Sequence, residues 1–201
     1  MVGGTWPWTL QRPSSLQRID TLVPDVFALW PKVLRDRRGF FTETYHQAEF
    51  ATLGITDQFV QDSHSCSCKG TLRGLHYQLR HPQAKLCRVV EGEALDVAVD
   101  IRVGSPHFGK WVSAVLSAKD LNQIYIPAGF AHGFLALSDT VHFLYKCSDF
   151  YDVEDQHGIA WDDPGLAIGW DISNPLISEK DKELPSLSSL PLESLPRYLR
   201  T

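Results

Sequence analysis

Apolar and polar residues alternate along much of the middle of the chain. Between residues 94 and 102, every second position is a branched aliphatic residue, and Asp96 and Asp100 lie between these positions. A period of two residues is typical of a β-strand with one apolar face and one polar face. The pattern therefore predicts a half-buried strand in which Asp96 and Asp100 share the polar face.

Similar short runs recur through the chain, and Gly, Pro, Ser or Asp separates most of them. The predicted strands cover residues 40–45, 72–78, 85–90, 94–102, 108–116, 123–126, 132–137 and 141–146. Helical patterns are scarce, and we expect short helices only at 47–53 and after Ser178. Many short strands with regular turn signals favour an all-β sandwich or barrel.

The organisation of the chain is that of one domain. Its 201 residues contain no repeat and no low-complexity linker, so we predict a single domain at 21–201 preceded by an N-terminal arm at 1–20. The arm lacks the basic start and apolar core of a secretory signal, and no run of about 18 apolar residues occurs. We therefore expect a cytoplasmic protein without a membrane span.

Composition and cysteine usage agree with that expectation. Hydrophobic residues make up 43% of the chain and charged residues 21%, with a net charge of -5 that offers no basic field for nucleic acid. The one-residue spacing of Cys66 and Cys68 suits neither a structural disulfide nor a zinc site with paired cysteines. We expect reduced thiols.

Candidate chemistry first appears in the predicted strand 72–78, Leu-Arg-Gly-Leu-His-Tyr-Gln. Strict alternation places His76 on one face and Arg73 on the other, unless a bulge at Gly74 resets the register. A glycine between large residues favours such a bulge or a close approach by a ligand. By itself, His76 is compatible with either a structural or a catalytic role.

A second motif contains His132. The segment Pro127-Ala128-Gly129-Phe130-Ala131-His132 resembles the second motif of the cupin superfamily, in which this histidine often binds a metal. The partner ligands there include a His-x-His pair, whereas Gln78 stands two residues after His76. Because a metal site needs three or four converging ligands, we predict that no metal is bound.

Six motifs together resemble one family, the dTDP-4-dehydrorhamnose 3,5-epimerases. They lie in the family's order at residues 39–43, 72–78, 96–102, 126–134, 143–146 and 176–181, and the resemblance covers about residues 25–187. It implies an all-β cupin-type double-stranded β-helix, or jelly roll, with a few short peripheral helices. It also implies a homodimer that needs no cofactor and inverts C3 and C5 of a dTDP-linked 4-keto-6-deoxy sugar.

The resemblance assigns the catalytic roles as well. His76 is the expected base, Asp181 orients it, Tyr145 is the acid on the opposite ring face, and Lys85 stabilises the enolate. The chemistry needs these groups, because removing a proton beside the C4 ketone gives an enolate and inversion needs a second proton donor. A carboxylate on one imidazole nitrogen fixes the tautomer and makes the ring more basic.

Substrate-binding positions follow by the same resemblance. The expected contacts are Arg38 and Arg73 with the diphosphate, Tyr151 with the thymine ring, and Glu43, Gln61, Ser63, His132, Gln156 and Lys180 elsewhere. Three positions depart from the family pattern: Ser63 replaces Asn, Phe150 replaces Tyr and Gln156 replaces Glu.

These departures leave alternatives open. A sibling enzyme that inverts only C3 or only C5 would share the fold, the base and the acid. A metal-dependent cupin oxygenase or a sugar-binding module belongs to a different class. The missing histidine after His76 disfavours the oxygenase, and a simple binding module would not need Tyr145 and Asp181.

Overall fold

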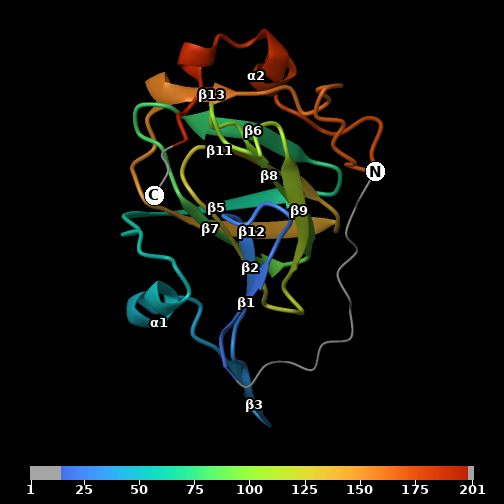
Figure 1. Ribbon diagram of the computed structural model, residues 1–201. Coiled ribbons are helices and arrows are strands. Elements are labelled where there is room, and N and C mark those ends of the chain that lie inside the picture. The colour runs from blue at the N-terminus through green and yellow to red at the C-terminus, as the bar shows by residue number, and fades with distance from the viewer. Residues whose placement is uncertain (1–14, 199–201) are drawn as a thin grey trace.

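Two antiparallel sheets packed face to face form the body of the protein (Figure 1). The structure is a computed structural model that describes residues 15–198. One sheet has the order β1 (Gln17–Asp20), β2 (Phe27–Trp30), β10 (Gln123–Ile126), β7 (Lys85–Glu91), β12 (Thr140–Cys147) and β5 (Gln61–Cys68). The other has the order β13 (Gln156–Gly158), β6 (Leu72–Gln78), β11 (Phe130–Ala136), β8 (Glu93–Asp100) and β9 (Trp111–Ser117).

The remaining elements are short and peripheral. Strands β3 (Leu34–Asp36) and β4 (Gly39–Phe41) form a separate hairpin. The helices are α1 (Gln47–Thr52) and α2 (Glu179–Lys182), with 3-10 turns η1 (Val153–Asp155), η2 (Leu187–Ser189) and η3 (Leu192–Ser194). This architecture confirms the predicted all-β jelly roll with a few short helices. The predicted strands 72–78 and 123–126 coincide with β6 and β10.

Two apolar layers hold the five-stranded sheet. On its inner face, Ala98 and Phe134 pack between the sheets against Phe143 of the other sheet. On its outer face, Val97 and Val99 pack under the C-terminal segment, which contributes Trp170 among other residues. Both faces are therefore buried, and burial of this apolar surface is the main force that fixes the sheet.

The prediction of a half-buried strand at 94–102 was therefore wrong. Asp96 and Asp100 in β8 are both fully buried rather than exposed. Asp100 accepts hydrogen bonds from Arg102 and Ser105, and Asp96 pairs with His132 inside the barrel. The alternation is real, but its polar face meets polar partners in the interior, which offset the cost of burying a charge.

A register shift at Gly74 shapes β6. His76 pairs with His132 of β11, but Arg73 pairs with Phe134, so the two strands lose register between these positions. The shift allows Arg73 and His76 to line the same cavity, although they are three residues apart. Gly74 has a φ of +101°, and a Cβ there would lie 2.5 Å from the carbonyl oxygen of His132. A side chain at this position is excluded by both contacts and conformation.

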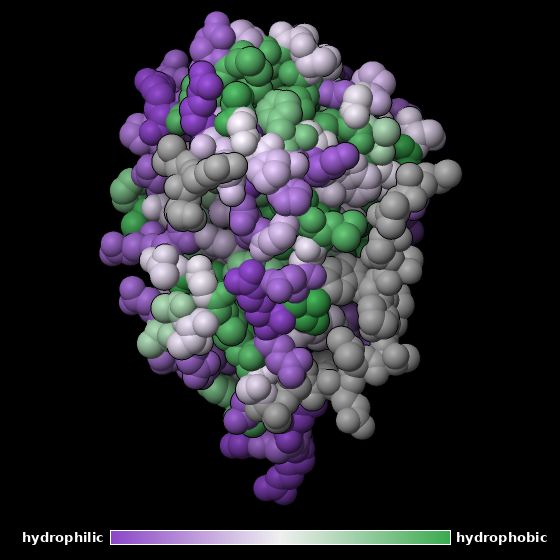
Figure 2. All heavy atoms as spheres, in the orientation of Figure 1, coloured by the Kyte–Doolittle hydropathy of each residue, from purple (hydrophilic) through white to green (hydrophobic). Residues whose placement is uncertain are grey.

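The hairpin β3–β4 lies at the opposite end of the molecule from α2 and β13 (Figure 1). Its charged tip, residues 35–38, is exposed and forms the strongly hydrophilic lower end of the surface in Figure 2. The predicted arm at 1–20 falls mainly on residues 1–14, which lie outside the described residues. Its last four residues form β1, which pairs with β2.

None of the helices in the described part of the chain has the length and apolar character required to cross a membrane. All four cysteines are free thiols, with Cys66 and Cys68 exposed on the same face of β5. The structure therefore agrees with the expectation of unpaired cysteines.

Candidate active site

A cavity of about 710 Å³ opens on the jelly roll and is lined by residues of both sheets and of the segment around α2. It brings together most of the site residues that the sequence predicts. These are Arg73, His76, Lys85, His132, Tyr145, Tyr151, Gln156, Lys180 and Asp181. Residues far apart in sequence thus meet at one place, which is the first requirement for a catalytic site.

His76 and Asp181 form a hydrogen-bonded pair in this cavity. Nε2 of His76 lies 2.7 Å from Oδ1 of Asp181, and the other carboxylate oxygen accepts from the backbone N–H of Gly74 at 3.3 Å. Ser178, the N-cap of α2, accepts from the backbone N–H of Asp181 at 3.1 Å and so fixes this turn.

The charge of Asp181 determines which nitrogen of the neutral His76 ring carries the proton. Burial alone raises the pKa of Asp181, but the hydrogen bonds from His76, Gly74 and Ser178 outweigh it and hold that pKa below its ordinary value. Asp181 is therefore an ionised acceptor at neutral pH. In the neutral imidazole, Nε2 carries the proton that it donates to Asp181, and Nδ1 is the basic nitrogen.

A second histidine–aspartate pair lies beside the first. His132 is the register partner of His76, and its Nε2 lies 2.8 Å from Oδ2 of the fully buried Asp96. Burial lowers the pKa of His132, and the nearby Lys85 and His76 act in the same direction against the opposing effect of Asp96. His132 is thus a neutral ring whose Nδ1 can accept a hydrogen bond from a hydroxyl or an ammonium group.

Tyr145 and Lys85 lie on the sheet that faces His76. They belong to β12 and β7, whereas His76 belongs to β6 of the other sheet. The Nζ atom of Lys85 lies 6.0 Å from the centre of the Tyr145 ring. Burial raises the pKa of Tyr145, although a hydrogen bond with Ser63 acts in the opposite direction. The phenol therefore remains protonated at neutral pH, as an acid must.

A small polar network lines the cavity near α2. Tyr151 donates its hydroxyl proton to Oε1 of Gln156 at 2.7 Å, and Lys180 donates to the same oxygen at 3.1 Å. Tyr151 is half exposed, so the face of its ring is available for stacking on a flat ligand.

Gln78 is a buried residue of β6 whose importance the sequence did not indicate, because it stood out there only as a glutamine in place of a second histidine. Its Oε1 accepts from the backbone N–H of Asp152 at 3.0 Å, and its Nε2 donates to the carbonyl of Phe150 at 3.1 Å. These bonds hold the loop that carries Tyr151. The signal for this role was a polar residue inside a predicted strand, and the buried amide has its hydrogen bonds satisfied by that loop.

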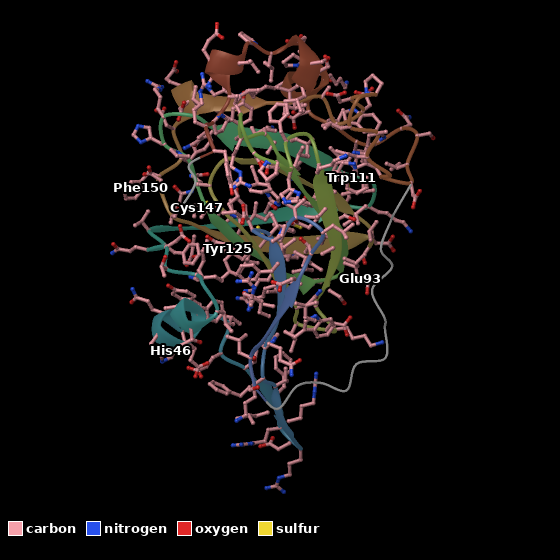
Figure 3. The ribbon with its side chains drawn as sticks, viewed as in Figure 1. His46, Glu93, Trp111, Tyr125, Cys147 and Phe150 are labelled. Atoms are coloured by element: carbon pink, nitrogen blue, oxygen red, sulfur yellow. The ribbon has the colours of Figure 1, made fainter. Side chains whose placement is uncertain are left out.

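Four predicted residues do not line this cavity. Arg38 is on the projecting hairpin, with its side chain 84% exposed and paired with Asp36. Glu43 lines a separate hollow beside α1. Gln61 and Ser63 lie on β5, where Ser63 is the register partner of Tyr145 and Gln61 accepts from the backbone N–H of Tyr151. Phe150, one of the departures from the family pattern, is exposed at the edge of the molecule (Figure 3).

One group among the described residues has the geometry to hold a metal ion. It consists of the buried Cys87, Asp96 and His132, whose candidate ligand atoms lie within 4.8 Å of one another. The imidazole nitrogen that would bind the ion is already bonded to Asp96. Lys85 acts electrostatically on both Cys87 and His132, and its charge opposes a second cation there.

Comparisons with known proteins agree on one family. A sequence model of dTDP-4-dehydrorhamnose 3,5-epimerase matches residues 20–189. The enzyme of that name from Shigella flexneri is 53% identical over 165 residues, which cover 81% of this chain and 91% of the relative. The enzyme from Neisseria gonorrhoeae is 52% identical over 164 residues, covering 81% of this chain and half of that longer relative.

A solved structure extends the match to the fold. The crystal structure of dTDP-6-deoxy-D-glucose-3,5-epimerase from Legionella pneumophila, in complex with dTDP-4-keto-L-rhamnose, has a TM-score of 0.89 and 46% identity to this chain. The alignment covers 92% of this chain and all of that one.

Proposed function

The chain belongs to the dTDP-4-dehydrorhamnose 3,5-epimerase family, and we propose that its cavity carries out this epimerisation with His76 as the base and Tyr145 as the acid. The observation that carries the assignment of roles is the placement of these two groups on facing sheets of one cavity. Inversion at carbon needs a base and an acid on opposite faces of the ring, and this arrangement supplies them.

The substrate is the dTDP-linked 4-keto sugar that the family name implies. The Legionella relative binds dTDP-4-keto-L-rhamnose, which carries the configuration after inversion at both carbons. The reaction of this carbohydrate epimerase therefore converts dTDP-4-dehydro-6-deoxy-D-glucose into dTDP-4-dehydro-L-rhamnose. It moves protons only, and neither redox chemistry nor a bond to the protein is required.

The proposed steps follow from the contacts. Nδ1 of His76 removes a proton beside the C4 ketone, and the electron pair of the C–H bond moves into an enolate with its charge on the C4 oxygen. The ammonium group of Lys85 stabilises that charge. Tyr145 then donates its phenolic proton to the opposite face of the same carbon. Solvent takes the proton from His76 and returns one to the phenolate, so no net proton is consumed.

The rest of the cavity holds the nucleotide. Arg73 is steadied by bonds to the Ser67 hydroxyl at 3.1 Å and the Cys66 carbonyl at 3.4 Å, so its planar guanidinium is positioned for diphosphate oxygens. Tyr151 offers its ring to the thymine base, and Lys180 adds a positive charge at the mouth.

Solvent deuterium provides the test of the reaction. When the 4-keto sugar nucleotide is incubated with the enzyme in deuterium oxide, we expect label at both C3 and C5, because one base serves both carbons. Nuclear magnetic resonance and mass analysis of the product measure the two positions. Label at a single carbon would instead assign the chain to the mono-epimerases.

We further propose that the working enzyme is a homodimer in which the hairpin β3–β4 of one copy completes the cavity of the other. Arg38 matches a diphosphate-binding position of the family, yet its side chain is exposed, and the hairpin that carries it lies at the end of the molecule far from α2 (Figure 1). The same hairpin exposes Phe40 and Phe41, which are 54% and 64% accessible. An exposed apolar pair beside an exposed arginine favours contact with a second copy.

Mixing of inactive variants tests this arrangement. Co-expressed Arg38→Ala and His76→Ala chains form mixed dimers that hold one intact site, so equal amounts should recover about a quarter of the wild-type activity. The matched control combines His76→Ala with Tyr145→Phe, whose side chains belong to the same cavity, and stays at background. Equal background activity in both mixtures would refute a shared site.

A reducing compartment suits the protein. All four cysteines are unpaired, and two of them are exposed. Because such thiols persist in the cytoplasm, we place the enzyme there. Its net charge of -5 gives no reason to propose a nucleic-acid partner.

A further inference from the structure

The fully buried carboxylate of Asp155 joins two loops, each of which connects one sheet to the other. Its Oδ2 atom accepts hydrogen bonds from the backbone N–H groups of Arg80 and His81, both at 2.8 Å. These donors belong to the loop 79–84 between β6 and β7, whereas Asp155 ends the turn η1 between β12 and β13. Asp155 is not among the described residues that line the cavity, and the proposed catalytic steps give it no task.

Asp155 is ionised in the folded protein. Burial by itself raises the pKa of this carboxyl, but hydrogen bonds from the backbone of the loop 79–84 and from the Arg80 side chain outweigh burial and hold the pKa below its ordinary value. Nε of Arg80 lies 3.4 Å from Oδ1, yet the Arg80 side chain is 61% exposed, so water screens this pair. A bond from an N–H group to a carboxylate is stronger than one to a neutral oxygen, so the two short backbone bonds are the main anchor.

The turn that Asp155 anchors separates two residues of the cavity. Tyr151 precedes Asp152, the N-cap of η1, and Gln156 is the C-cap. The backbone N–H of Asp155 donates to the carbonyl of Asp152 at 3.1 Å and closes the turn. The Tyr151 hydroxyl donates to Oε1 of Gln156 at 2.7 Å, so the position of each side chain depends on the other. A displacement of Asp155 would therefore reach the ring of Tyr151.

The groups that carry out the proton transfers have separate anchors. The loop that donates to Asp155 leads into Lys85 at the start of β7. Just before this lysine, the N–H of Ala84 donates to the Ser148 hydroxyl at 2.8 Å, and the N–H of Ser148 donates to the Ala84 carbonyl at 3.0 Å. The proposed base and acid lie within strands β6 and β12. Loss of the Asp155 carboxylate should therefore displace Tyr151 and leave these groups in place.

We propose that Asp155 is a positioning residue that sets the affinity of the enzyme for the nucleotide, because it holds the ring of Tyr151 where the thymine base stacks. The inference rests on the proposed contact between Tyr151 and that base. It assigns control of nucleotide affinity to a carboxylate outside the described lining of the cavity. It also implies that nucleotide affinity and catalytic rate respond separately when Asp155 is changed.

Calorimetric titration and steady-state kinetics test this separation. Asp155→Ala removes the acceptor, and we expect dTDP to bind about tenfold more weakly, KM to rise in proportion and kcat to stay within about twofold. Binding of inorganic pyrophosphate should not change, because Arg73 is held independently by the Ser67 hydroxyl. Asp155→Asn keeps an oxygen that can accept from both N–H groups, so it should recover the affinity for dTDP to within about threefold.

Asp163→Ala is the matched control. Asp163 is also buried and accepts from the backbone N–H groups of Gly165 and Leu187, both at 2.7 Å, but it does not line this cavity. Its substitution should lower Tm, as Asp155→Ala does, and leave the affinity for dTDP unchanged. If Asp155→Ala does not fold, Asp155→Ser replaces it, since the hydroxyl is a shorter acceptor, and should weaken dTDP binding about threefold.

Three results would overturn the role of Asp155. They are unchanged dTDP affinity in the folded Asp155→Ala or Asp155→Ser protein, an equal loss of affinity for pyrophosphate, and equal losses in Asp155→Ala and Asp155→Asn. Tyr151→Ala judges the proposed function separately. If that variant binds dTDP as tightly as the wild type, the contact with thymine and the inference fail together. If it binds weakly while Asp155→Ala binds normally, only the role of Asp155 fails.

Discussion

His76→Ala is expected to abolish proton exchange at both C3 and C5 of the sugar. General-base catalysis contributes roughly 10² to 10⁴ in rate, and no other described group of the cavity has the same pairing with Asp181. His132 cannot replace it readily, because burial lowers the pKa of its imidazole. We therefore expect a loss of about 10³-fold or more.

Binding and exchange must be measured together in this variant. Calorimetric titration with dTDP should give an affinity close to that of the wild type, because Arg73, Tyr151 and Lys180 are untouched. Deuterium uptake into the 4-keto substrate should disappear at the same time. If exchange continued within tenfold of the wild-type rate while binding was normal, His76 would not be the base.

A strand is best predicted from the sequence when its two faces differ in polarity or when both faces are apolar. Strands β6 and β10 match their predicted bounds. β10 is a short, mainly apolar run before Pro127, and β6 carries apolar residues at intervals and follows the turn at Gly70. Strand β5 was not predicted, since it reads Gln-Asp-Ser-His-Ser-Cys-Ser-Cys. It lies at the edge of its sheet, and its inner residue Ser65 faces a polar cavity rather than an apolar core.

Asp96 shows a limit of pattern reading that is physical in origin. A period of two residues separates two faces of a strand, but it does not say whether the polar face meets solvent or a buried polar partner. His132, 36 positions later, decides this for Asp96, because its imidazole takes the carboxylate into the interior. Contacts over such a separation become visible only in the folded chain.

For the candidate site, the sequence predicts which residues take part better than it predicts where they lie. His76, Asp181, Tyr145 and Lys85 were predicted by resemblance, and the fold places them around one cavity. Arg38 was also predicted as a ligand, but its side chain lies exposed on a hairpin outside this cavity, and no residue pattern reveals that placement. The hydrogen bond from the backbone N–H of Tyr151 to Gln61 involves the main chain, which no residue pattern reveals.

Tyr145→Phe is expected to separate exchange from inversion. The variant keeps the ring and its packing against Phe143 but loses the acidic proton. His76 can still form the enolate and return a deuteron, picked up from solvent, to the face it came from. We therefore expect deuterium at C3 and C5 with retained configuration, while inversion falls by about 10²-fold or more.

The pH dependence and a matched control strengthen that test. Burial raises the pKa of Tyr145 above its ordinary value of about 10, so the phenol is protonated at every pH below that and wild-type inversion should not decline on its account until the pH exceeds it. Tyr125→Phe removes a phenol of the same sheet that donates to Asp57 at 2.6 Å outside the cavity (Figure 3). That variant should lose about 1 kcal/mol of stability and keep the wild-type ratio of exchange to inversion. Normal inversion in Tyr145→Phe would require another acid on this face of the cavity.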